Sequence, residues 1–151
     1  MASYYQCGGR SSATAATADN FGAALWNPAA SKPLYVREIW WFKNSTTADN
    51  FELSRISARG TASTTVTPDI DNDRDRLLAP GTGALLDVAY SGQPTIVTPA
   101  LARGNLAAAG GAGYMFAFDP PIRVAAGEGL GIATPVATAL QAADVTFVWQ
   151  E

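Results

Sequence analysis

The residues best placed for chemistry are four aspartates that recur at every second position of one short run, Asp69, Asp71, Asp73 and Asp75. Oxygen ligands at alternate positions are typical of the first half of a calcium-binding loop. The second half of that pattern is missing. Counting from Asp69, the sixth residue is Arg74 where a glycine is expected, and the twelfth is Pro80 where a glutamate is expected.

Two arginines alternate with these acids and would neutralise part of their charge, because Arg74 and Arg76 each stand next to Asp75. The sequence therefore predicts an exposed loop with local Asp–Arg pairs, each of small energy. Two alternatives stay open. The four aspartates form a weak calcium site, or the alternating charges fix the register of a contact between neighbouring subunits.

Side chains for acid–base or nucleophilic catalysis are scarce. The chain has no histidine and a single cysteine, Cys7, so neither a Cys–His pair nor a Ser-His-Asp triad can be assembled and one chain offers no zinc ligand set. Paired carboxylates would suffice for sugar cleavage, but Asp19, Asp49, Asp119 and Asp144 all stand at the ends of expected strands. We expect a protein that is not an enzyme and binds no cofactor.

Aromatic residues are the other candidates for binding. Trp40, Trp41, Phe42 and Trp149 lie inside strong strand patterns, which predicts a place in the core or an interface, with sugar stacking as the alternative. Three more aromatics, Tyr4, Tyr5 and Trp26, stand in less regular surroundings. We expect these three, together with Arg74 and Arg76, to contact a partner.

The overall composition narrows the classes of partner. Charged residues make up 15% of the chain against about 25% in a typical soluble domain, and apolar residues make up 48%. A chain with so few ionic groups has spare apolar surface, which predicts a homo-oligomer. Net charge is −3 and Lys32 and Lys43 are the two lysines, so no nucleic-acid partner is expected.

Other features of the sequence bear on the cellular compartment in which the protein is expected. No run of about 18 apolar residues is present, so we expect no membrane span, and the first residues lack the basic and apolar regions of a secretory signal. The lone Cys7 cannot form an internal disulfide, which is consistent with assembly in a reducing cytoplasm.

Short apolar runs separated by Gly, Pro, Asn and Thr predict many short strands. The clearest is Leu34–Asn44, whose two faces are both partly aromatic, so we expect it in the middle of a sheet and covered on both sides. Further strands are expected at 21–26, 51–58, 95–98, 114–118, 122–124, 130–134 and 145–149, and 84–90 is either a strand or a short helical turn.

This pattern predicts an all-β fold, an antiparallel β-sandwich of jelly-roll type with about eight strands. The first twenty residues show no regular pattern, so we expect an irregular N-terminal arm over 1–20 and a sandwich domain over 21–151.

The C-terminal half carries three motifs, Asp119-Pro120-Pro121-Ile122-Arg123-Val124, Gly127-Glu128-Gly129-Leu130-Gly131-Ile132 and the ending Asp144-Val145-Thr146-Phe147-Val148-Trp149-Gln150-Glu151. Together with Ile39–Thr46 they resemble small β-sandwich structural proteins of tailed bacteriophages, of the capsid decoration (cement) type. The resemblance implies a trimer that binds and stabilises the lattice of the major capsid protein. It further implies assembly in the host cytoplasm and a final place on the capsid surface of the virion.

The sequence also allows a second interpretation, in which the chain belongs to a different functional class, that of receptor-binding modules. A jelly-roll module at the tip of a head or tail fibre would bind host surface glycans through exposed Trp or Tyr side chains gathered in one concave site.

Overall fold

The computed structural model describes residues 4–28, 32–68 and 83–151. These residues form strands and connecting loops, with no α-helix in the described ranges and therefore no helix that could cross a membrane. The ten strands are β1 (Tyr4–Arg10), β2 (Phe21–Asn27), β3 (Leu34–Lys43), β4 (Asp49–Ala58), β5 (Thr61–Val66), β6 (Leu85–Gly92), β7 (Thr95–Leu106), β8 (Gly113–Val124), β9 (Glu128–Ala133) and β10 (Ala143–Gln150).

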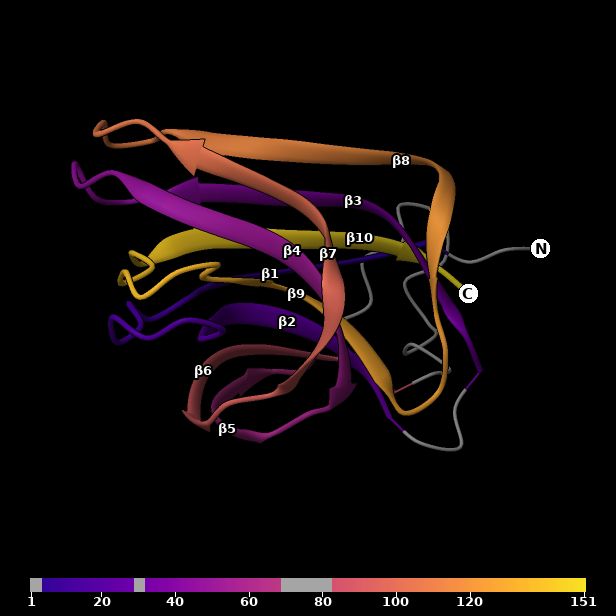
Figure 1. Ribbon diagram of the computed structural model, residues 1–151. Helices are drawn as coiled ribbons and strands as arrows, with labels where there is room; N and C mark the ends of the chain where they lie inside the picture. The colour runs from indigo at the N-terminus through magenta and orange to yellow at the C-terminus, as the bar shows by residue number, and fades with distance from the viewer. Residues whose placement is uncertain (1–3, 29–31, 69–82) are drawn as a thin grey trace.

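The strands form two antiparallel sheets that face each other (Figure 1). The four-stranded sheet has the order β1-β10-β3-β8, and the six-stranded sheet has the order β5-β6-β2-β9-β4-β7. Without β5 and β6 the two sheets read β1-β10-β3-β8 and β2-β9-β4-β7, which is the strand order of an eight-stranded jelly roll. The predicted fold class is confirmed. The additional pair, β5 and β6, extends the second sheet beside β2.

The predicted N-terminal arm is wrong for residues 4–10. These residues form β1, which pairs with β10 in a continuous register from Tyr4 opposite Gln150 to Arg10 opposite Asp144. The side chains of Tyr5 and Cys7 are buried in the main core, so β1 is part of the sandwich rather than a separate arm. The sequence hides this strand because two glycines follow Cys7 and interrupt the alternation of apolar and polar residues.

Large side chains from both sheets fill the main core. Trp41, Phe147 and Trp149 come from the four-stranded sheet, and Leu25 and Leu53 come from the six-stranded sheet; all are fully buried. Burial of large apolar side chains is the main contribution to the stability of such a sandwich, at roughly 1.5–3 kcal/mol each.

The six-stranded sheet is strongly curled, because very short links join strands that lie far apart in it. Arg59–Gly60 connects β4 to β5, and Gln93–Pro94 connects β6 to β7. Each link passes between strands four places apart in the sheet order. In a flat sheet this separation would be about 19 Å, whereas a two-residue link reaches about 11 Å. The sheet must therefore bend until the two sides approach, and Figure 1 shows β5, β6 and the lower part of β7 curving together.

The curled sheet encloses a second, smaller core on its outer face. Phe21, Ala24, Ile56 and Ala133 are each at most 1% exposed and cluster together there. Partly buried Trp26, Tyr90 and Ile96 pack against them. The sheet thus covers the part of its outer face around this cluster, whereas Val97 and Leu101 of β7 stay 39% and 45% exposed.

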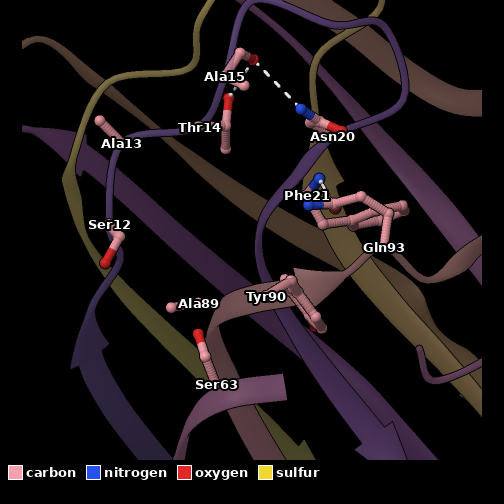
Figure 2. Close-up of a pocket in the computed structure, with 10 residues that line it drawn as sticks. All are labelled: Ser12, Ala13, Thr14, Ala15, Asn20, Phe21, Ser63, Ala89, Tyr90 and Gln93. Carbon is pink, nitrogen blue, oxygen red and sulfur yellow. Dashed lines mark hydrogen bonds between the residues drawn. The ribbon is translucent and has the colours of Figure 1, made fainter. Parts of the chain in front are cut away.

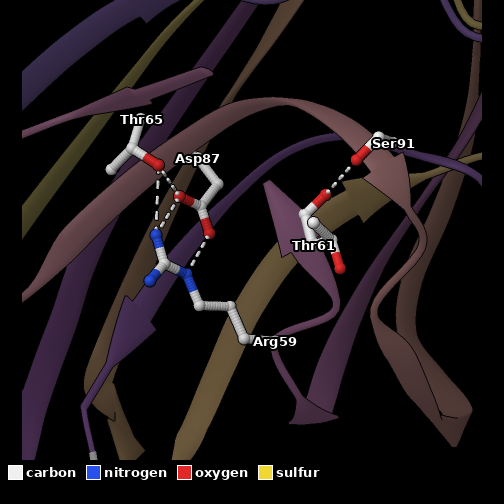
Figure 3. Close-up of polar contacts among 5 residues, drawn as sticks. All are labelled: Arg59, Thr61, Thr65, Asp87 and Ser91. Atoms are coloured by element: carbon white, nitrogen blue, oxygen red, sulfur yellow. Dashed lines mark hydrogen bonds and ion pairs between the residues drawn. The ribbon is translucent and has the colours of Figure 1, made fainter. Parts of the chain in front are cut away.

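A partly buried ion pair ties the β4–β5 link to β6 (Figure 3). Asp87 is fully buried and accepts hydrogen bonds from Arg59 Nε at 2.8 Å and from Arg59 Nη2 at 2.7 Å. It also accepts one from the Thr65 hydroxyl at 2.6 Å. Beside this pair, Gly60 has a φ of 73° and lies so close to Gly92 that a β-carbon would overlap its carbonyl oxygen. Glycine at position 60 is therefore a condition of the curl.

Candidate interaction surface on the four-stranded sheet

The outer face of the four-stranded sheet, in contrast, carries large apolar side chains that nothing in the described chain covers. On this face Trp40 of β3 is opposite Met115 of β8 and also opposite Thr146 of β10. We call the apolar residues of this face the outer-face patch: Trp40, Phe42, Met115, Ala117 and Val148. They come from three neighbouring strands, so the sheet itself fixes their spacing.

The exposure within the patch is unusual for side chains of this size. Met115 is 62% exposed and Phe42 is 36% exposed, while Trp40 and Val148 are half-buried. The indole Nε1 of Trp40 donates a hydrogen bond to Glu38 Oε2 at 2.9 Å, so the polar atom of the ring is satisfied within the chain. What Trp40 presents outward is therefore its apolar ring surface.

A glycine allows the Phe42 ring to lie over β8. Gly113 stands opposite Phe42 in the register, and a β-carbon at position 113 would overlap both the Phe42 ring and the carbonyl oxygen of Trp41. Any other residue at this position would displace the ring. Glycine at position 113 is therefore required for this placement of the Phe42 ring.

Polar and charged groups border the patch. On one side, Arg37 donates hydrogen bonds to the Gln150 side chain at 2.9 and 3.1 Å, and its guanidinium lies 5.6 Å from the centre of the Tyr4 ring. On another side, Arg10 and Asp144 form an exposed ion pair at 2.8 Å. The hydrogen bond from Arg10, assisted by its charge, lowers the pKa of Asp144. An apolar centre with a polar rim is the usual anatomy of a protein–protein interface.

The structure separates the three aromatics that the sequence predicts as partner contacts. Tyr4 is exposed at the edge of this same outer face, beside Arg37. Tyr5 is 5% exposed and stacks on Trp149 in the main core, 5.7 Å between ring centres, so its prediction as a contact residue is wrong. The reason is the alternation of β1, which points Tyr4 outward and Tyr5 inward. Trp26 lies on the other sheet and packs against the second core.

The surroundings of β3 also differ from the prediction. The strand does lie inside its sheet, between β10 and β8, but its outer face is open rather than covered. A bulge between Val36 and Glu38 shifts the alternation, so that Val36 and Ile39 both point into the core. Trp40 and Phe42 are consequently exposed to different degrees on the outer face, while Trp41 and Trp149 are core residues.

The sequence analysis did not identify Met115 as an exposed contact residue. The strand expected at 114–118 did contain it, and the alternation of Tyr114, Phe116 and Phe118 places Met115 on the opposite face. Phe116 and Phe118 pack against the main core, and Tyr114, which is 42% exposed, continues their stacked row along β8, with ring centres 6.0 and 6.2 Å apart. The outward direction of Met115 could have been found from that alternation, but its place next to Trp40 required the register.

The predicted ion site and two predicted contact arginines cannot be placed. Asp69, Asp71, Asp73, Asp75, Arg74 and Arg76 all lie outside the described residues. Within the described ranges, no three acidic or cysteine side chains gather in a way that could hold a metal ion.

The chain was compared with protein-family models, with curated proteins and with solved structures, and none of them matches it.

Proposed function

We propose that this chain is a non-enzymatic structural protein that decorates a bacteriophage capsid. In this proposal the protein binds the lattice of the major capsid protein through its outer-face patch and acts as a homotrimer. The observation that carries the proposal is that exposed Phe42 and Met115 lie together with half-buried Trp40 on one open sheet face. A large apolar group on an open sheet face favours contact with another protein.

Three further features support this role. The jelly roll is a fold common among viral capsid proteins and lectins. The low charge of the chain and the polar rim formed by Arg37 and Arg10 suit a surface that meets another protein rather than water. Repetition of the contact over three copies would strengthen binding even where each single contact is weak.

Binding to capsids tests the proposal directly. Purified protein is mixed with expanded capsids that lack decoration, prepared from the phage whose genome encodes the chain, and the bound fraction is measured by sedimentation. We expect saturation at a fixed ratio to the major capsid protein. Capsids that bind none of the protein, or that bind it without saturation, would contradict the proposal.

The position of the contact is tested by a matched pair of substitutions. Met115→Asp places a charge in the centre of the outer-face patch, and Val136→Asp places the same charge at another exposed apolar residue, which is 46% exposed. We expect Met115→Asp to weaken capsid binding by about tenfold or more, because a buried unpaired charge is costly, and Val136→Asp to leave it unchanged. If both variants lost capsid binding equally, the outer-face patch would not be the site of contact with the capsid.

The oligomeric state is measured separately by native mass spectrometry. A trimer is expected at micromolar concentration. A monomer that nevertheless saturates capsids would overturn the trimer while leaving the decoration role in place.

A further inference from the structure

A small pocket lies on the other side of the molecule, where the segment between β1 and β2 meets β5 and β6 (Figure 2). Its volume is about 260 Å³, just below the range of about 300–1,000 Å³ typical of sites for drug-sized ligands. Three stretches of chain far apart in the sequence build it: Ser12–Ala15 with Asn20–Phe21, Ser63 of β5, and Ala89–Tyr90 with Gln93. The pocket has room for one small ring.

The lining of the pocket is polar but uncharged. Its walls carry the hydroxyls of Ser12, Thr14, Ser63 and Tyr90 and the amides of Asn20 and Gln93, with no Asp, Glu, Lys or Arg among the residues that line it. Among the hydrogen bonds of the described residues, none involves the hydroxyls of Ser12, Ser63 or Tyr90, whereas the Thr14 hydroxyl donates to the carbonyl oxygen of Ala15 at 3.2 Å. The hydroxyls of Ser12, Ser63 and Tyr90 are therefore available to a ligand as both donors and acceptors.

Hydrogen bonds fix the walls in place. The side chain of Asn20 donates to the carbonyl oxygen of Ala15 at 3.2 Å, which closes the segment on itself. Gln93 Oε1 accepts from the backbone N–H of Phe21 at 2.8 Å, which orients the amide of Gln93. The backbone N–H of Thr14 donates to the carbonyl oxygen of Leu140 at 2.9 Å. The hydroxyl oxygen of Thr14 accepts from the backbone N–H of Leu140, also at 2.9 Å. Such a pocket needs little ordering when a ligand enters.

We propose that this pocket binds a neutral polyhydroxyl compound of the size of one monosaccharide. The proposal goes beyond the proposed function, and the pocket lies on residues that the outer-face patch does not use. Vicinal hydroxyls of a sugar can each donate and accept, which matches a neutral wall of hydroxyl groups better than a purely apolar or ionic ligand would. Tyr90 and Phe21, whose rings pack edge to face 6.4 Å apart, supply the aromatic part of the wall.

The electrostatics of the pocket argue against an ionic ligand. Neither an anion nor a cation would find a counter-charge among the lining residues. Burial, together with the charge of Asp87, raises the pKa of Tyr90, so its phenol stays protonated and neutral. Asp87 itself is fully buried and already paired with Arg59.

Nuclear magnetic resonance titration of the full chain tests this proposal. The probes are the methyl glycosides of glucose, galactose, mannose and N-acetylglucosamine, with inorganic phosphate as the ionic comparison. We expect at least one glycoside to shift the backbone resonances of Ser63, Ala89 and Tyr90, with a Kd of about 1 mM. We expect phosphate to leave the same resonances unchanged.

Two variants and a matched control locate the binding. Tyr90→Phe removes a free hydroxyl from the pocket and keeps the ring, whereas Tyr114→Phe removes a hydroxyl from an exposed tyrosine on β8 outside it. The first is expected to weaken glycoside binding about five- to tenfold, the loss of one net hydrogen bond, and the second to leave it unchanged. Ala13→Arg, at an exposed position on the rim, is expected to block the pocket without unfolding the chain.

Three results would overturn the proposal. These are the absence of shifts at the pocket with all four glycosides, phosphate binding at the same residues, or glycoside binding that survives Ala13→Arg undiminished. Because capsid binding is measured with the patch variants, the proposed function and this inference can fail independently of each other.

Discussion

The two sheets differ in how far the apolar side chains on their outer faces are shielded from water. Both sheets carry apolar residues on the side that points away from the main core. In the six-stranded sheet, two short links bring β5 and β6 close to β4 and β7, and Phe21 and Ile56 are almost fully buried. In the four-stranded sheet the strands are not linked in this way, and Phe42 and Met115 stay exposed.

The difference shows that apolar residues on a sheet face do not by themselves predict burial. What decides it is the length of the connections relative to the strand order. A curled sheet covers part of its own outer face, and an open sheet leaves that face exposed to water. The experiments below probe this contrast by making equivalent changes on the two faces.

The largest effect is expected from removing one phenylalanine ring on each face. Phe21→Ala empties the second core and should lower the free energy of unfolding by about 3–5 kcal/mol. Phe42→Ala removes a ring that is 36% exposed and leaves no enclosed cavity, so it should cost less, about 1–2 kcal/mol. Chemical denaturation of both variants measures the difference. Similar losses for the two would mean that the outer-face patch is packed as a core, and the contrast would fail.

The ion pair that ties the curl together should give the next largest effect. Asp87→Ala leaves Arg59 beside a partly buried site without its partner, and we expect a loss of about 3 kcal/mol of unfolding free energy. The matched change in the exposed pair of the other sheet, Asp144→Ala, should cause a much smaller loss. A stable Asp87→Ala variant would show that the short links hold the curl without this pair.

Thiol reactivity can compare the inner and outer faces of the four-stranded sheet. Cys7 points into the core, and burial raises its pKa from 9.0 to about 11, so its reactive thiolate is scarce at neutral pH. A thiol introduced on the outer face by Met115→Cys, in a chain where Cys7 is replaced by Ser, should react about a hundredfold faster with a disulfide reagent. Equal rates would mean that β1 opens readily from the sandwich.

The smallest effect is expected on the free energy of unfolding when the pH is lowered. The pKa of Asp144 lies below its ordinary value because of Arg10, so this pair contributes stability above about pH 4 and loses it as the pH falls through the lowered pKa. The drop in stability between about pH 6 and about pH 3 should therefore be slightly smaller for Arg10→Ala than for the unchanged protein. Urea denaturation at the two pH values measures it. A larger drop in the variant would reverse the sign of the argument.

The sequence predicted the fold class and most strands because their alternation is strong. The strand expected at 51–58 matches β4, and the one expected at 34–44 matches β3 to within one residue. The uncertain stretch at 84–90 is β6. Those runs contain β-branched and aromatic residues at alternate positions, which is a local signal.

Two strands and both outer faces could not be predicted in this way. In β1 the glycines at positions 8 and 9 conceal the alternation, and in β5 most of the side chains are exposed, so neither has a clear apolar face. Whether Phe21 or Phe42 would be covered depends on which strands are neighbours and how short their links are. Those are long-range properties that a local pattern does not contain.

The pairing of β1 with β10 also has a consequence for how the protein is made. The side chains of Arg10 and Asp144, which form an ion pair across these two strands, are separated by 134 positions along the chain. During synthesis β1 must wait, with its backbone groups unpaired, until nearly the entire described chain has left the ribosome. The four-stranded sheet is thus completed last at one of its edges, and its formation is expected to be slow because the contacts are remote in sequence.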